Sequence, residues 1–323
     1  MSTKAELLEF LQSADGRFVS GQEIADHLKI SRNSVWKAVT ALKKDGYQIE
    51  GRSKAGYRIA GSGGGLSVAE IQSFLNARAD VEVYDSVTST NDIAKLKSLT
   101  HRPIAIIANK QTEGRGRYGR AFASPSGTGL YMTIALKPMF SLQKSPFVTM
   151  ATAVAVCRAI NKVCNIEPGI KWVNDIYYKK KKVCGILTEA QTSLETGIID
   201  RLIIGIGINC FPGSFPAELR KIAGALTDTA HSFSRSELAA EVINELVPIL
   251  MDLEAMSFMS EYRRRCFILG HRVRIHPTHD EEGIAAKALA IEDDGALLVE
   301  YQEGPKKGTR ESIRSGEISV SIY

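Results

Sequence analysis

The segment TEGRGRYGRAFASPSGTGLY, residues 112–131, contains glycines with the spacing G-x-G-x-x-G, namely Gly114, Gly116 and Gly119. Three arginines stand among them, Arg115, Arg117 and Arg120. The dinucleotide-binding fingerprint has this spacing but requires an α-helix that begins on the glycines, and the following RAFASPSGTG predicts no helix. A Walker A loop is also excluded, because no G-K-[ST] follows.

What remains is a loop between two apolar strands in which glycines bring backbone N–H groups close to an anion. The arginines add charge-assisted, bidentate contacts to phosphate or carboxylate groups. The pattern therefore predicts a highly anionic ligand, or a loop that folds over one. A solvated surface loop is the alternative.

Two other stretches carry candidate polar groups. In KWVNDIYYKKKKVCGILTE, residues 171–189, a strand is expected to end at the Asn-Asp pair before a run of lysines. Such a run is most often a solvated hairpin turn, but Lys182 adjoins the next strand and is a candidate to point into a site. Asp175 is either a buried structural acid or the carboxylate that orients an incoming amine. In GIGIN, residues 205–209, glycines allow close approach of a ligand and Asn209 offers an amide.

The N-terminal residues have the pattern of a winged helix-turn-helix. Ser20 and Glu23 form a capping box that opens one helix, and Ser31 caps a second helix. The second helix has an apolar face at Val35, Val39 and Leu42, and Gly46 follows it as a C-terminal glycine. Two short alternating strands, YQIE and YRIA, come next and are separated by GRSKAG.

Residues 29–58 contain eight basic and two acidic residues, a net charge of +6 against +5 for the whole chain. Such a local basic excess is typical of a module that binds a polyanion. On a recognition helix Arg and Asn read base edges and Lys contacts phosphates, while a basic hairpin tip reaches the adjacent backbone. We predict DNA contacts from Ser31, Arg32, Asn33, Trp36, Lys37, Thr40, Lys43, Arg52 and Lys54. The alternatives are a solvated basic helix in a structural domain and, for Trp36, a position half in the core.

After a flexible stretch, AGSGGGL at 60–66, strand and helix signals alternate. Strands are expected in VEVYDSV, IAIIANKQ, LYMTIALK, IKWVND, VCGILTEAQ and RLIIGIGINC. Helices are expected over 67–78, 90–99, 145–163 and 234–268. The fold class is therefore α+β in three domains: a winged helix (1–62), a mixed α/β domain (66–268) and a small SH3-like β-barrel (269–323).

Composition indicates a cytoplasmic protein without a membrane partner. The five cysteines include no C-x-x-C pair and predict no disulfide framework. The opening MSTKAELLEFL is amphipathic rather than a signal peptide, and no apolar run is expected to reach the roughly 20 residues of a membrane span. Three histidines, His271, His276 and His279, lack a fourth ligand and a rigid helical spacing, so no metal site is expected there.

Four motifs together resemble the biotin–protein ligase family: STN at 89–91, KQTEGRGRYGRAFASPSGTGLYMT at 110–133, KWVND with the strand after it, and GIGIN. With a winged helix in front, the chain is similar to the bifunctional members, in which the ligase is also the repressor of the biotin operon. The similarity spans all three segments, and G-R-G-R-x-G together with K-W-x-N-D is specific. Two positions depart from the pattern: Val173 stands where proline is usual, and Tyr118 where a further basic residue is often found.

The resemblance implies that ATP, with Mg²⁺, activates biotin to biotinyl-5′-AMP, and that biotin then passes to a lysine of a biotin carboxyl carrier protein or carboxylase carrier domain. It assigns biotin binding to Ser89, Thr90, Asn91, Gln111, Arg115, Gly116, Arg117, Lys182 and Gly185. It assigns adenylate contacts to Arg117, Arg120, Phe122, Asn174 and Asn209. Arg115, Arg117 and Lys182 are expected to neutralise the approaching anions, and Asp175 to orient the acceptor lysine or accept its proton.

We further expect the adenylate to order the 112–128 loop and to favour a homodimer that presents two winged helices to operator DNA. Two other functions remain open. A lipoate or octanoate ligase shares the catalytic fold but usually lacks the G-R-G-R-x-G loop. A ligand-sensing DNA-binding repressor without ligase activity does not need the intact set Arg115, Arg117, Asp175 and Lys182.

Overall fold

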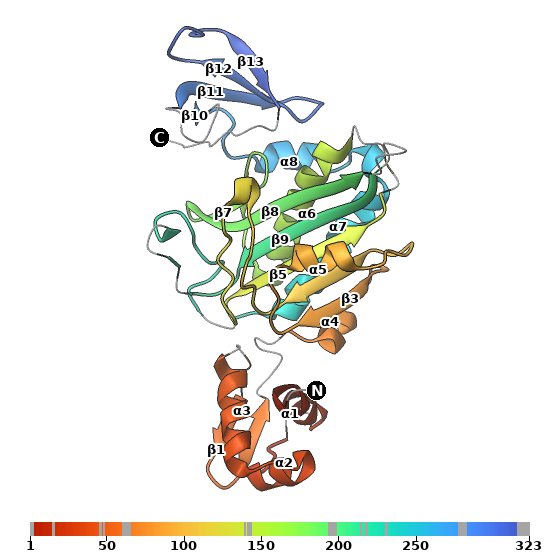
Figure 1. Cartoon of the computed structure of the whole chain (residues 1–323). Helices are drawn as coiled ribbons and strands as arrows, with labels where there is room; N and C mark the ends of the chain where they lie inside the picture. The colour runs from red at the N-terminus through yellow and green to blue at the C-terminus, as the bar shows by residue number, and fades with distance from the viewer. Residues whose placement is uncertain are drawn as a thin grey trace.

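The computed structural model describes residues 3–14, 17–44, 47, 49–59, 66–138, 140, 144–192, 199–213, 215–216, 219–229, 232–276 and 283–314. The predictions for Gly46, for residues 60–65 of the linker and for His279 fall outside these ranges. Figure 1 shows the N-terminal helices, a central sheet with its helices, and a small C-terminal sheet following one another along the molecule.

The N-terminal unit contains α1 (Thr3–Ser13), α2 (Gly21–Leu28), α3 (Arg32–Lys44), β1 (Ile49–Arg52) and β2 (Gly56–Ile59). Ser20 and Ser31 cap α2 and α3 by accepting from the backbone N–H three residues on, at 3.0 and 3.1 Å, as predicted. The apolar face of α3 is buried in a separate small core that includes Val35, Val39 and Leu42. Since β1 and β2 form an antiparallel hairpin, the winged helix-turn-helix is confirmed.

The central sheet is built from β3 (Asp80–Tyr84), β4 (Ile104–Ala108), β5 (Gly129–Leu136), β6 (Gly169–Lys171), β7 (Asp175–Tyr178), β8 (Lys181–Thr192) and β9 (Ile199–Asn209). The strand order is β3-β4-β5-β9-β8-β7-β6, with β3 parallel to β4 and the other neighbours antiparallel. The helices are α4 (Val68–Phe74), α5 (Thr90–Leu96), α6 (Ser145–Cys164), α7 (Arg235–Met251) and α8 (Met259–Arg265), with 3₁₀ turns η1 (Arg117–Gly119) and η4 (Leu253–Ala255). This is the predicted mixed α/β domain.

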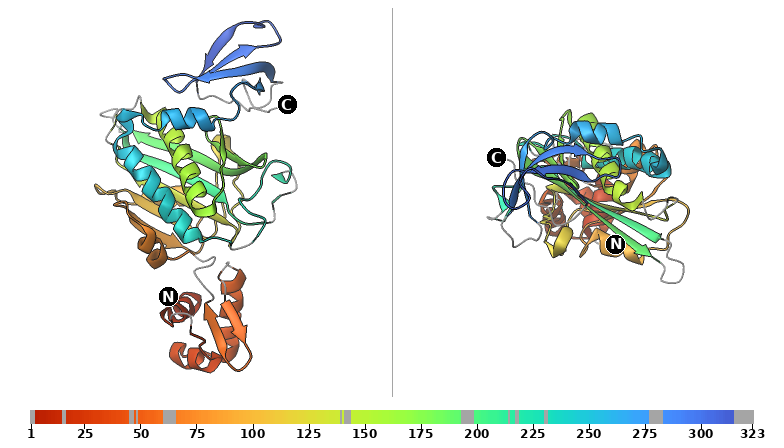
Figure 2. Two further views of the ribbon diagram at one scale, coloured as in Figure 1. Left: turned by 180° about the vertical axis from the view of Figure 1, so that it is seen from behind. Right: turned by 90° about the horizontal axis from the view of Figure 1, so that it is seen from above.

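The two faces of the sheet are covered differently. Helices α6 and α7 pack on one face (Figure 2), whereas α5 lies on the other face (Figure 1). In β4 the alternation of side chains decides the faces: Ala105 and Ile107 belong to the main core, whereas Ile106 packs with Ala94 of α5. The face that carries α5 also carries the candidate site.

Helix α6 corrects one expectation. Its residues Pro146–Cys164 are long and apolar enough to cross a membrane, with a mean hydropathy of 1.4, although Arg158 and Lys162 interrupt the apolar run. Of the 18-residue stretch that meets this criterion, 67% is buried, and the helix packs against the sheet and α7. This burial is that of a core helix.

Helix α4 ends earlier than predicted, at Phe74 rather than at residue 78. The side chain of Asn244 on α7 accepts from the N–H groups of Asn76 and Ala77, at 2.7 and 3.0 Å. The same side chain donates to Phe74 O at 2.9 Å. A tertiary contact thus replaces the backbone bonds that a further helical turn would form.

Two other helix predictions are wrong in extent. Helix α5 ends at Leu96 rather than at residue 99, and the guanidinium of Arg201 donates to two carbonyls of its last turn, at 2.7 and 2.6 Å. The single helix predicted over 234–268 is divided into α7, η4 and α8. Pro248 supplies no N–H to the last turn of α7, and Met256 after η4 has a φ of 51°.

The C-terminal unit is an antiparallel sheet of β10 (Arg272–Ile275), β11 (Ile284–Ile291), β12 (Leu297–Tyr301) and β13 (Arg310–Ile313), in that order. Gly295 lies in the turn before β12 with a φ of 83°, where glycine is favoured. Val273 and Val299 of this sheet belong to the main core. The small β domain is confirmed, and its closure into an SH3-like barrel stays a prediction.

Candidate active site and DNA-binding surface

One row of paired residues crosses the open face of the sheet and carries several candidate groups. Gly207 of β9 lies opposite Gly185 of β8. Gly185 lies opposite Asp175 of β7, which in turn pairs with Lys171 of β6. Paired residues of neighbouring strands have side chains on the same face. The strand that begins at Asp175 was not predicted from the sequence. Residues 172–174 form a turn after β6, and β7 starts directly after this turn.

The glycines of this row make room for an aromatic ring. A Cβ added at Gly207 would lie 2.5 Å from Cε1 of Phe122. A Cβ at Gly185 would lie 3.5 Å from Cε2 of the same ring and 3.3 Å from Cε of Lys182. The space that these glycines leave open is therefore occupied by the side chains of Phe122 and Lys182, which lie side by side.

Next to this ring, polar residues form a chain of hydrogen bonds on the sheet. Thr90 N and Oγ1, at the start of α5, donate to Oε1 of Gln111 at 2.8 and 3.0 Å. Thr133 Oγ1, on β5, lies 2.8 Å from Thr90 Oγ1 and 2.6 Å from Asn91 Oδ1. Asn91 Nδ2 donates to Glu189 of β8 at 2.7 Å. The first turn of α5 is therefore held in one orientation over β5 and β8.

Glu189 and Thr133 belong to this chain of hydrogen bonds, but the sequence motifs did not identify them as site residues. Hydrogen bonds from Lys95 and Asn91 hold the pKa of the Glu189 carboxyl below its ordinary value, although burial opposes the shift. Gly205 of β9 leaves the space that Asn91 fills, since a Cβ there would lie 2.5 Å from Asn91 Oδ1. A single polar residue in a strand is a weak sequence signal, so only the strand register identifies these two.

The glycine–arginine segment is a β-ribbon. Phe122 N donates to Gly114 O and Gly116 N to Arg120 O, each at 2.7 Å, and η1 forms the tip. At Gly119 the φ of +70° favours glycine, and no atom would lie within 4 Å of a Cβ there. Within this fully described segment no α-helix begins on the glycines, as predicted. The N–H groups of Gly116 and Phe122, however, bond within the ribbon.

The arginines of the ribbon have different partners. Arg115 forms an ion pair with Asp92 in the first turn of α5. Arg117 Nη1 donates to Asn174 Oδ1 at 3.2 Å, and its Nη2 donates to the hydroxyl of Tyr118 at 2.6 Å. The ribbon is thereby tied to α5 on one side and to the β6–β7 turn on the other.

A cluster of charges lies at the end of the glycine row. Lys182 Nζ is 2.6 Å from Asp175 Oδ1, and these side chains are 30% and 19% exposed. Burial lowers the pKa of Lys171, the charge of Asp175 opposes this, and the charges of Lys182 and Arg120 add to it. Lys171 was not predicted as a site residue, although it is the first letter of K-W-x-N-D. Positive charge therefore exceeds negative charge here, which favours an anionic ligand.

The lysine run behaves only partly as predicted. Lys179 and Lys180 are exposed in the turn between β7 and β8. Lys181 is not left to water as expected, since its Nζ donates to the carbonyls of Arg220 and Lys221 at 3.0 and 2.6 Å.

Two further predicted residues lie at the margins of this face. Ser89 precedes α5, is 3% exposed, and does not cap the helix with its side chain. Asn209 ends β9 two residues beyond Gly207 and so has its side chain on the same face. The structure thus gathers Ser89, Thr90, Asn91, Gln111, Arg117, Phe122, Asn174, Asp175, Lys182, Gly185 and Asn209 on one face. Arg115 and Arg120 are exposed at its rim.

The predicted DNA contacts form an exposed surface on α3 and the β1–β2 turn. Exposed side chains along α3 and its cap are those of Ser31, Arg32, Asn33, Trp36, Lys37, Thr40 and Lys43. In the hairpin, Arg52 at the end of β1 and Lys54 in the turn are exposed. Trp36 is 57% exposed, so it is not half in the core. Two hydroxyls already have partners in the helix: Ser31 caps it, and Thr40 Oγ1 donates to Trp36 O at 2.8 Å.

Comparisons with known proteins cover all three parts of the molecule. Residues 83–209 match the Biotin/lipoate A/B protein ligase family, residues 3–58 an HTH domain, and residues 268–321 the Biotin protein ligase C terminal domain. The bifunctional ligase/repressor BirA of Bacillus subtilis is 35% identical over 94% of this chain and 96% of its own. BirA of Escherichia coli is 27% identical over 94% of this chain and 95% of its own.

Among solved structures, the biotin protein ligase from Aquifex aeolicus in complex with biotin and ATP matches with a TM-score of 0.63 and 28% identity. The match covers 76% of this chain and 99% of that ligase.

Proposed function

We propose a role for each part of this chain, which belongs to the family of bifunctional biotin ligases and repressors. The chain is a biotin–protein ligase and a biotin-responsive repressor. It joins biotin to ATP and passes the biotinyl group to a carrier-protein lysine. We assign DNA binding to residues 1–62, catalysis to 66–268 and a supporting β domain to 269–323, and we place the protein in the cytoplasm.

The biotin ring binds at the start of α5. It is neutral, so it needs oriented donors and acceptors rather than charge. The chain of bonds through Gln111, Thr90, Thr133 and Asn91 supplies these in fixed positions. Ser89 adds a hydroxyl, and the glycines Gly116 and Gly185 let the backbone lie close to the ligand.

Adenylation takes place at the charged end of the glycine row. A carboxylate oxygen of biotin bonds to the α-phosphorus of ATP, and pyrophosphate leaves. Because both reactants are anionic, Arg115, Arg117 and Lys182 are needed to cancel their repulsion and stabilise the charge that develops. The adenylate contacts Arg117 and further groups beside it, namely Arg120, Phe122, Asn174 and Asn209.

Transfer uses Asp175. The ε-amine of the acceptor lysine attacks the biotinyl carbonyl carbon, AMP leaves, and the amine gives up a proton. Asp175 orients this amine and accepts the proton, because its carboxylate lies in the same row as the adenylate site and already holds an ammonium group, that of Lys182.

Mg²⁺ fits this arrangement as a companion of the phosphates. Among the residues that the structure describes, no group of three or more His, Cys, Asp or Glu is placed to hold a metal ion by itself. Mg²⁺ commonly binds through one or two carboxylates together with substrate phosphates. Asp175, whose buried Oδ1 faces the ammonium group of Lys182 at 2.6 Å, is the carboxylate of this row that would hold it, and the ion would supply charge neutralisation.

The observation that supports the proposal most is the ion pair of Lys182 with Asp175 beside Phe122, over Gly185. The test is biotin-dependent exchange of labelled pyrophosphate into ATP, with lipoate and octanoate as competing acids. Exchange with biotin alone supports the assignment. Exchange with lipoate or octanoate instead would make the chain a ligase for those acids, and no exchange with any acid would contradict the adenylation site.

The repressor acts through operator DNA, and we propose that the adenylate controls it by favouring a homodimer. The ribbon links the ligand site to the surface, since Arg117 bonds to the β6–β7 turn while η1 at the tip is exposed. A dimer presents two α3 helices to two half-sites. Sedimentation and DNA-binding measurements with and without adenylate test this, and an unchanged monomer–dimer equilibrium contradicts it.

A further inference from the structure

The turn that leads from β6 into Asp175 is held from outside the candidate site. Nε1 of Trp172 donates to the carbonyl of Gly295, in the turn between β11 and β12, at 3.1 Å. The hydroxyl of Tyr262, on α8, donates to the carbonyl of Val173, also at 3.1 Å. Burial raises the pKa of Tyr262 well above its ordinary value, so this hydroxyl remains a donor.

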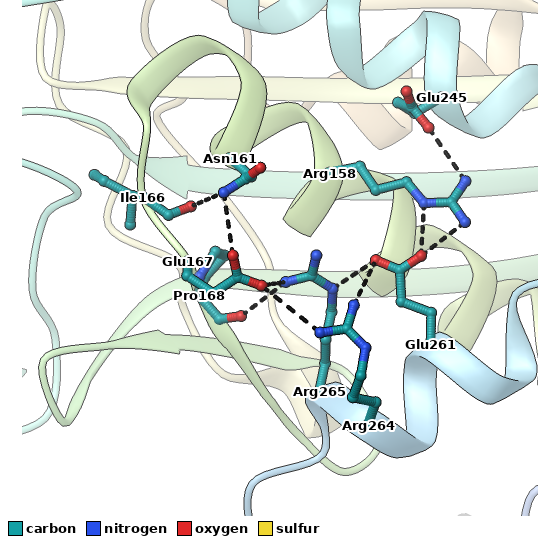
Figure 3. Close-up of polar contacts among 9 residues, drawn as sticks. All are labelled: Arg158, Asn161, Ile166, Glu167, Pro168, Glu245, Glu261, Arg264 and Arg265. Atoms are coloured by element: carbon teal, nitrogen blue, oxygen red, sulfur yellow. Dashed lines mark hydrogen bonds and ion pairs between the residues drawn. The ribbon is translucent and has the colours of Figure 1, made fainter.

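Helix α8 is itself fixed by a network of ion pairs, which Figure 3 shows. Glu261 lies 2.8 Å from Nη2 of Arg158 on α6 and 2.7 Å from Nε of Arg265. Arg265 continues to Glu167, just before β6, at 2.8 Å. Although burial opposes it, these arginines hold the pKa of Glu261 below its ordinary value, so the carboxylate stays charged. The network joins α6, α8 and the start of β6 into one support.

The turn whose carbonyl accepts from the Trp172 indole is also attached to α8. Arg263 Nε donates to the carbonyl of Ile291 at 2.9 Å, and its Nη2 donates to Asp293 at 2.6 Å. A Cβ at Gly295 would lie 3.1 Å from Cε of Met150, so this turn also packs closely on α6. The carbonyl of Gly295 is therefore a fixed acceptor.

We propose that α8 and residues 291–296 form a clamp that positions the turn 172–175 for catalysis. Tyr262 and Trp172 are then positioning residues: they act through this turn on Asn174, which bonds to Arg117, and on Asp175, which pairs with Lys182. The proposal rests on the function proposed above for these site residues. Its physical basis is that a misplacement of about 1 Å in a catalytic group costs roughly 10²-fold in rate.

The test uses the full chain with Tyr262→Phe, which removes one hydroxyl and keeps the ring. We expect biotin-dependent pyrophosphate exchange to lose about tenfold in kcat, because the turn loses one of two tethers rather than its whole support. The KM for biotin is expected to stay unchanged, since Thr90 and Gln111 lie on other elements. Tyr301→Phe is the matched control: Tyr301 is also buried, but in β12 of the C-terminal sheet, and this variant is expected to match wild type.

A double variant separates positioning from general stability. Because Tyr262 acts through the turn that carries Asp175, Tyr262→Phe is expected to slow transfer of biotin to the carrier lysine, the step assigned to Asp175, by less in an Asp175→Asn background than in wild type. The full tenfold loss in both backgrounds would overturn the proposal. Wild-type kcat in Tyr262→Phe would overturn it as well.

A second variant and a second measurement guard against unfolding. Trp172→Phe removes the other tether and is expected to show the same split between kcat and KM, with thermal unfolding measured for each protein. A loss of kcat that merely follows a loss of folded protein overturns the proposal. If wild type itself shows no exchange, the proposed function fails instead, so the two failures are distinguishable.

Discussion

Replacing Lys182 by methionine removes one charge from the candidate phosphate site and keeps most of the side-chain volume. Lys182 is 30% exposed, so its surroundings are partly solvated. With an effective dielectric constant of about 20, two unit charges about 4 Å apart attract by about 4 kcal/mol. Screening by solvent at a side chain of this exposure reduces the value, and we take about 3 kcal/mol. At about 1.4 kcal/mol per tenfold, adenylation is expected to slow by roughly 10²-fold.

The assay is biotin-dependent pyrophosphate exchange at saturating biotin and ATP. Lys180→Met is the matched control, because it removes the same charge two residues away in the exposed β7–β8 turn. This control is expected to keep the wild-type rate. A loss in Lys182→Met no greater than in Lys180→Met would refute the placement of Lys182 beside the phosphate.

Three other predictions follow from the same geometry. Arg117→Ala is expected to release preformed adenylate roughly 10- to 150-fold faster, since a hydrogen bond to a charged group contributes about 1.5–3 kcal/mol; an unchanged release rate removes Arg117 from the site. Lys37→Ala on α3 is expected to reduce the slope of log K for operator binding against log salt concentration by about one, and an unchanged slope contradicts a phosphate contact. The lowered pKa of Glu189 contributes stability that is complete above its ordinary 4.5 and is lost as pH falls through the folded-state value. Glu189→Gln is therefore expected to lose less stability on acidification than wild type, as measured by thermal unfolding, and an equal loss contradicts this.

Local sequence signals were sufficient for the starts of helices and for the winged helix. A serine side chain caps the backbone within three residues, so Ser20 and Ser31 needed no tertiary information. The ends of helices were predicted less well. Asn244 and Arg201 come from distant parts of the chain and take over the polar groups of α4 and α5. No local pattern reveals such replacements.

The candidate site likewise contains residues that a local pattern reveals and residues that only the tertiary fold brings together. The ribbon and its arginines stand out because glycine and arginine alternate within a short segment. Glu189 and Thr133 do not stand out, because they meet Asn91 only through the order of β5, β9 and β8. Tyr262 was also not predicted, since its partner Val173 is 89 residues away.

The layout of this face also bears on the shape of the ligand. Thr133 stands on β5 and Asp175 on β7, with β9 and β8 between them. At about 4.8 Å per strand, these two groups are separated by about 14 Å across the sheet. Gly207 and Gly185 lie between them, and there the sheet carries Phe122 rather than side chains of its own. A compact ligand would reach one end of this row, whereas an elongated one, with a neutral ring over α5 and a phosphate at Lys182, reaches both. Under the function proposed above, we expect biotinyl-5′-AMP to span this row, because it carries a neutral biotin ring and a phosphate.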